Sequence, residues 1–138
     1  MPNGIDILLA DHRNVGALFA QFDQSGDANL IGQVIDALKA HDDAEQAALY
    51  PFAGTLLGNT TLIERAAAAH STVKKQFDVI GSLEGAPLID AFRKLRQIVD
   101  KYVTDEERNL FPKLAEQASP QQLEALGARL LQAKQRVG

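Results

Sequence analysis

The chain of 138 residues contains no cysteine, which excludes disulfide bonds, thiolate metal sites and cysteine nucleophiles. It also has no run of lysine or arginine, and its net charge of -4 is mild, so a nucleic-acid or anionic-membrane surface is not expected. No uninterrupted apolar stretch reaches the length of a membrane span, and the first residues lack a basic segment followed by an apolar run. These absences favour a cytoplasmic protein without nucleic-acid or membrane partners.

Strong helix formers dominate what is present, and aromatic residues are few. Glycine and proline fall mostly between segments in which apolar residues recur at steps of three and four. The length suits one domain with a sizeable core. The pattern predicts an all-α fold, in which an up-down-up-down four-helix bundle is followed by a short C-terminal fifth helix. We expect the helices at about residues 4–24, 28–57, 61–80, 87–112 and 119–137, with the bundle proper covering 3–116.

Polar residues interrupt the apolar rows of these helices. His41 and Glu45 are four residues apart, so one helical turn places them on the same face, and that face is otherwise apolar. His12 and His70 stand in the middle of the rows of the first and third helices. Counted from the turns, these groups lie at one level of the bundle. Buried polar groups need a partner, and a metal ion is one such partner.

The sequence also contains an internal repeat. Residues 41–51 (HDDAEQAALYP) align without gaps with residues 102–112 (YVTDEERNLFP). The difference that matters for metal binding is at the first position, which is histidine in one segment and tyrosine in the other. The preceding helices share the pattern H-x-x-V-x-x-x-F around their histidines. Two similar hairpins that face each other would suit a pair of metal ions, with Glu45 and Glu106 available to bridge them. Pro51 is expected to kink or restart the second helix.

The order His, His-x-x-x-Glu, His and Tyr-x-x-x-Glu, with Leu-Tyr-Pro and Leu-Phe-Pro after the glutamates, resembles the hemerythrin family. The resemblance is to the branch called the HHE cation-binding domain and extends from residue 1 to about 115. It implies a non-heme centre of two iron ions with an oxo or hydroxo bridge. The ligands that it implies are His12, His41, Glu45, His70 and Glu106. The sequence departs from the family at Tyr102, where a second histidine is expected, and at Lys74, where oxygen carriers have another.

Tyr102 is therefore a sixth candidate ligand, and its alternative role is a core aromatic whose hydroxyl bonds a neighbour. Tyr50 and Phe111 are expected to line the site by packing, with Tyr50 a lesser candidate for a phenolate. Asp42 could turn toward a metal ion, but we expect it on a solvated helix face. We also expect Lys74 to extend into solvent and three acidic residues to be surface charges: Asp43, Asp105 and Glu107.

Imidazole and carboxylate ligands without thiolate suit iron, zinc or manganese, and the resemblance favours iron. Such a centre would keep positions open for an exogenous ligand. The leading hypothesis is a reaction with O2-derived ligands, foremost the catalase-like decomposition of hydrogen peroxide, because a phenolate at Tyr102 would favour ferric iron over a reversible O2 carrier. The alternative is a module that binds or senses O2, nitric oxide or iron without turnover. A zinc or manganese hydrolase is the third hypothesis. The sequence leaves open whether the protein is an enzyme.

Overall fold

The computed structural model describes residues 2–58 and 61–137, which form helices joined by short connections and confirm the all-α class. Two short π-helices, η1 and η2, each stand between α-helices that they join end to end. The elements in chain order are α1 (Gly4–Ser25), α2 (Asn29–Ala44), η1 (Glu45–Leu49), α3 (Tyr50–Leu57), α4 (Thr61–Gly81), α5 (Gly85–Asp105), η2 (Glu106–Leu110), α6 (Phe111–Gln117) and α7 (Pro120–Val137).

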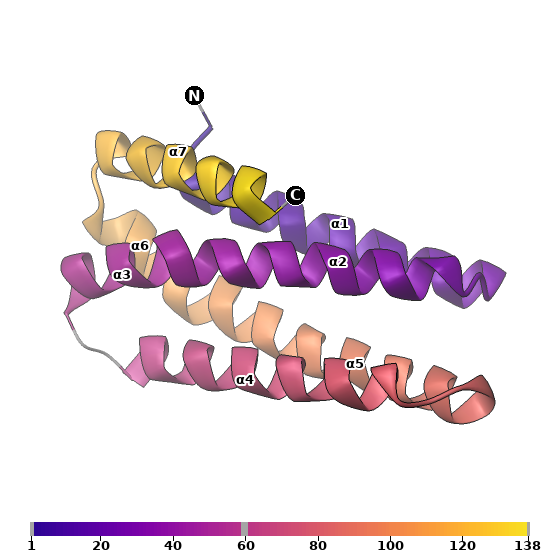
Figure 1. Ribbon diagram of the computed structural model, residues 1–138. Helices are drawn as coiled ribbons and strands as arrows, with labels where there is room; N and C mark the ends of the chain where they lie inside the picture. Colours follow the sequence, from indigo (N-terminus) through magenta and orange to yellow (C-terminus); the bar gives the residue numbers. More distant parts are fainter. Residues whose placement is uncertain (1, 59–60, 138) are drawn as a thin grey trace.

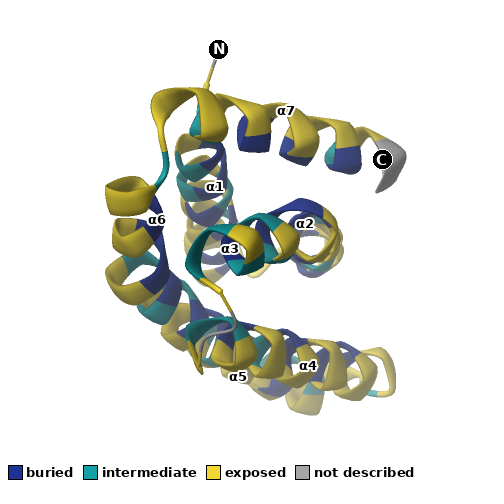
Figure 2. Cartoon of the chain, turned by 90° about the vertical axis from the view of Figure 1, so that its left-hand side faces the viewer, coloured by how far each residue is buried: buried dark blue, intermediate teal, exposed yellow. Residues whose placement is uncertain are grey.

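The predicted four-helix bundle is confirmed. α1 and α2 form one antiparallel hairpin and α4 and α5 form the second, with η1–α3 and η2–α6 extending α2 and α5 (Figure 1). The additional helix α7 has 18 residues and packs on the outside of the bundle against α1, α2 and η1 (Figures 1 and 2). No helix in the described part of the chain is long and apolar enough to cross a membrane.

The helix ends follow local signals in the sequence. The Asn3 side chain caps α1 by accepting a hydrogen bond from the backbone N–H of Asp6 at 2.9 Å. Gly26 ends α1 in the left-handed conformation, with φ of 66°, which glycine adopts without steric cost. α5 begins at Gly85, slightly earlier than expected, so Pro87 lies within the first turn instead of starting it. There its missing N–H removes no intrahelical bond.

Both long inner helices are interrupted just before a proline. Pro51 was expected to kink or restart its helix, and the interruption takes the form of η1, after which α3 begins at Tyr50. The N–H of Tyr50 donates to the carbonyl of Glu45, five residues back, and the N–H of Phe111 donates to that of Glu106. A π-turn widens the helix where a proline ring would otherwise clash with the preceding turn. The repeat in the sequence is thus a repeat in the structure.

The interior consists of two apolar clusters with polar residues between them. One cluster occupies the end of the bundle with the α1–α2 and α4–α5 connections, and includes Phe19, Val34, Leu38, Val73, Phe92 and Leu95. The other lies where α7 covers the bundle, and includes Leu8, Leu49, Leu110, Leu114, Leu126 and Leu130. The buried faces of the helices turn toward one another (Figure 2). The polar residues between the clusters are therefore shielded from water.

Candidate metal centre

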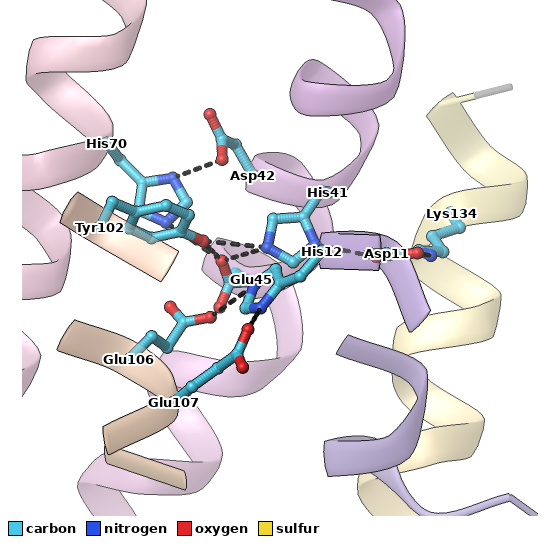
Figure 3. Close-up of polar contacts among 10 residues, drawn as sticks. All are labelled: Asp11, His12, His41, Asp42, Glu45, His70, Tyr102, Glu106, Glu107 and Lys134. Atoms are coloured by element: carbon cyan, nitrogen blue, oxygen red, sulfur yellow. Dashed lines mark hydrogen bonds and ion pairs between the residues drawn. The ribbon is translucent and has the colours of Figure 1, made fainter. Parts of the chain in front are cut away.

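The six side chains predicted as metal ligands come together in this polar layer (Figure 3). Each of the four bundle helices contributes at least one of them, and the π-helices that extend α2 and α5 contribute one each. All six residues are at most 9% exposed, and Glu45 is fully buried. They are His12 from α1, His41 from α2, Glu45 from η1, His70 from α4, Tyr102 from α5 and Glu106 from η2. The structure therefore brings together the residues that the periodicity singled out.

Each of the three imidazoles has a carboxylate beside its Nδ1 atom. The pairs are His12 with Glu107 at 2.7 Å, His41 with Asp11 at 2.8 Å, and His70 with Asp42 at 3.0 Å. Histidines that bind metal ions usually donate their second ring N–H to a carboxylate or carbonyl, which fixes the tautomer and the ring orientation. In all three residues Nε2 is on the side of the ring away from this carboxylate and is the atom available as a ligand.

The three Nε2 atoms point toward the two glutamates. His12 Nε2 lies 3.2 Å from Glu106 Oε1, while His41 Nε2 and His70 Nε2 lie 2.8 and 3.3 Å from Glu45 Oε1. One carboxylate oxygen of Glu45 thus lies between histidines of two different helices. The Tyr102 hydroxyl is in the same place, because it donates to Glu45 Oε1 and lies 2.9 Å from His41 Nε2.

Several of these buried polar atoms have no hydrogen-bond partner among the described residues. They include Nε2 of His12, Oε2 of Glu45 and both carboxylate oxygens of Glu106. A buried polar atom without a partner costs about 1–3 kcal/mol. The potential ligand atoms form two sets, and within each set all of them lie within 4.8 Å of one another. One set is His12, His41 and Glu106, and the other is Asp42, Glu45 and His70. The residues fit a cation-binding centre, since cations would satisfy these atoms and offset the charge of the carboxylates.

The electrostatics of the layer point the same way. Burial, followed by the charge of Glu45, raises the pKa of Glu106 well above its usual range. Burial also raises the pKa of Glu45, but the charge of His41 and hydrogen bonds with His41 and His70 outweigh it, so the net shift is downward. Burial lowers the pKa of His41, yet its contacts with Glu45 and Asp11 raise it overall to about 10. The raised pKa values mean that Glu106 and His41 hold protons on atoms whose lone pairs a cation would also bind.

Aromatic rings from both halves of the repeat flank the histidines, and they belong to the two residues that the sequence suggested as packing there. The ring of Phe111 stacks on His12 with centroids 5.8 Å apart and an interplanar angle of 8°. Tyr50, its counterpart in the repeat, meets His70 edge-on with centroids 5.4 Å apart. Burial, followed by the charge of Glu45, raises the pKa of Tyr50, which favours a neutral phenol that packs against the site.

Two residues lie where the sequence did not place them. Asp42 is only 2% exposed and contacts His70, so the prediction of a solvated aspartate was wrong. Asp42 directly follows His41, so its side chain leaves α2 in a direction about 100° away from that of His41. This direction faces α4, where His70 lies. Glu107 was expected to be a surface charge, but its half-exposed side chain contacts His12. Lys74 and Asp43 are exposed as predicted, and Asp105 pairs with Arg65 at the surface.

The sequence reasoning missed Asp11 and its partner on α7, Lys134. The repeat carried a signal for Asp11, because this residue aligns with Ala69 just as His41 aligns with Tyr102. At this position of the repeat, an acid is therefore present only in the half that has histidine, and not tyrosine, on its second helix. Burial raises the pKa of Asp11, but its contacts with His41 and Lys134 outweigh it, so the net shift is downward and the group is charged.

Comparison with known proteins agrees with this geometry. A crystal structure of a hemerythrin HHE cation-binding domain-containing protein from Mycobacterium kansasii has the same fold, with a TM-score of 0.82 at 21% identity over 99% of this chain and 90% of that one. A curated relative from Nostoc sp. (strain PCC 7120), described as a DNA nickase, is 30% identical in an alignment 138 positions long that covers 96% of this chain and 39% of that protein. This chain thus spans about two fifths of that relative. The family model for the hemerythrin HHE cation-binding domain matches residues 3–114, and the chain belongs to this family.

Proposed function

We propose that this domain holds two iron ions in its polar layer and decomposes hydrogen peroxide. The observation that carries the proposal is the pair of ligand sets, one containing Glu106 and the other Glu45, whose carboxyl groups contact each other. Two iron ions can exchange the two electrons that separate peroxide from water or from O2. The chain's own residues bind and orient these ions and balance their charge.

The histidines supply neutral nitrogen ligands that are held in orientation by their carboxylate partners. Glu45 and Glu106 supply the negative charge that two cations need, and their shared position suits bridging. Tyr102 adds an oxygen that, as a phenolate, favours ferric over ferrous iron. This preference argues for turnover of peroxide and against reversible carriage of O2, for which the iron must rest in the ferrous state.

The surface is hollowed beside this layer. A hollow of about 570 Å³ opens between α2 and α4, and Asp42, which contacts His70, is part of its lining. Lys39 and Lys74 line the hollow together with Asp42, Asp43 and Asp78, so charges of both signs surround it. The two apolar clusters close the layer along the bundle axis, so the hollow offers an approach that suits a molecule of a few atoms.

The proposal is tested with protein loaded anaerobically with Fe(II) and freed of unbound metal. We expect repeated turnover of hydrogen peroxide, with one O2 released for every two molecules consumed. The zinc-loaded protein is the matched control, because zinc takes the same ligands without redox chemistry, and it should consume none. If the iron protein consumes at most one equivalent of peroxide per site, or its reduced form binds O2 reversibly, the domain is a binding or sensing module.

A further inference from the structure

Asp11 uses both of its carboxylate oxygens, one toward the metal centre and one toward α7. Its Oδ2 atom lies 2.8 Å from Nδ1 of His41, and its Oδ1 atom accepts a hydrogen bond from Nζ of Lys134 (Figure 3). The side chains of Asp11 and Lys134 are 18% and 25% exposed. A chain of direct contacts thus runs from α7 to a predicted metal ligand.

α7 is fixed closely enough on the bundle to hold Lys134 in one place. Leu126 and Leu130 of α7 are completely buried in the cluster that they share with α1, η1 and η2. The helix also approaches the N-terminal backbone at Gly127, where an added Cβ would lie 2.5 Å from the carbonyl oxygen of Pro2. α7 begins after the region that matches the family model, which ends at residue 114.

The contact of Lys134 with Asp11 is also particular to one histidine. In the described part of the chain, Asp42 and Glu107, the carboxylates beside the other two imidazoles, have no ion pair with a lysine or arginine. The repeat does not generate the contact either, because Asp11 aligns with Ala69 and α7 lies outside both repeated hairpins. His41 is therefore set apart from the other two histidines by its surroundings.

We propose that Lys134 is a positioning residue of the metal centre, which acts through Asp11 on His41. The cationic hydrogen bond holds the carboxylate in the orientation that receives the His41 N–H. It also draws negative charge away from Asp11, which then withdraws the Nδ1 proton less strongly and leaves Nε2 a weaker electron donor. The inference rests on the proposed iron centre and is independent of the reaction that this centre performs.

The test compares three variants by their affinity for Fe(II), measured in competition with a chelator, and by the reduction potential of the iron-loaded protein. Lys134→Met removes the charge but keeps an unbranched stem. It should weaken Fe(II) binding by about tenfold, the lower end of what loss of a ligand's partner causes, because the loss of a fixed Asp11 outweighs the stronger donation from Nε2. That stronger donation should shift the potential to more negative values. Lys134→Arg should restore both quantities. Arg129→Met removes the same charge from an exposed position of the same helix and should change neither.

A double-mutant cycle shows whether Lys134 acts through Asp11. Asp11→Asn should weaken Fe(II) binding by about 10–100-fold, and adding Lys134→Met should then cause no further loss. Equal losses in both backgrounds would overturn the inference. So would a Lys134→Met protein that melts at a lower temperature without metal but keeps its affinity and potential, since Lys134 would then only secure α7. A wild-type protein that binds no iron would instead overturn the iron centre itself.

Discussion

At the scale of single residues, Tyr102 marks the main chemical difference between the two halves of the protein. The repeat predicts that it occupies the place of His41, and the structure has its hydroxyl between His41 and Glu45. This position suits a ligand, and it equally satisfies a neutral phenol whose hydroxyl bonds a carboxylate. Colour separates the two roles, because a phenolate bound to ferric iron absorbs visible light.

We therefore expect the ferric protein to have a broad visible absorption that Tyr102→Phe abolishes while two iron ions stay bound. The chain has two tyrosines, and Tyr50→Phe is the matched control. Tyr50 packs on His70 with a buried hydroxyl, so its replacement should leave the colour intact. A Tyr102→Phe protein that keeps both its colour and its peroxide turnover would reduce Tyr102 to a packing residue. Tyr102→His should move the reduced protein toward O2 binding.

The residues of the centre differ in how far the sequence could reveal them. His12, His41 and His70 were predictable because each stands in an apolar row, and the three rows place them at a common depth where their side chains must meet. The burial of Asp42 was not predictable, because a residue next to a buried one points away from the buried row. Whether a neighbouring helix covers that direction depends on how the helices pack. The contact of Lys134 with Asp11 was not predictable for the same reason. This contact joins residues 123 positions apart on elements with no shared pattern.

At the scale of elements, the helices were predictable from periodicity and from their caps, and the π-helices were not. Pro51 and Pro112 indicate that the helix must change, but several changes satisfy a proline: a kink, a break or a widened turn. The structure widens both helices at the same point of the repeat, directly after the last α-helical turn. Glu45 and Glu106 are the first residues of the two π-helices, and both are buried in the polar layer.

The close packing of α7 against the N-terminal backbone can be tested at Gly127, with Gly16 as a comparison. Gly127→Ala places a methyl group against the backbone carbonyl of Pro2, which has little freedom to move, and should destabilise the protein by about 1–3 kcal/mol. Gly16, exposed on α1, has no atom within 4 Å of an added Cβ, so Gly16→Ala should stabilise by roughly 0.5–1 kcal/mol through helix propensity. Urea unfolding of the metal-free proteins measures both. Equal effects would show that α7 is not held against the N-terminal backbone.

At the scale of the whole molecule, the fold places a polar layer between two apolar clusters. A layer with several unpartnered buried atoms weakens a bundle unless a ligand binds there in the folded state only. Iron at a hundred times its dissociation constant would then stabilise the protein by about 2.7 kcal/mol. For a chain of this size we expect a rise of roughly 10 °C in the melting midpoint.

The central claim is that this layer holds two cations, and the iron content of the protein tests that claim most directly. The metal-free protein is loaded anaerobically with Fe(II), desalted, and assayed for iron per chain and for its melting midpoint. We predict two iron ions per chain and a raised midpoint, and one ion or none in Glu45→Gln, which keeps the shape of the side chain but not its charge. A wild-type protein that retains no iron, or melts at the same temperature with and without it, would contradict the claim.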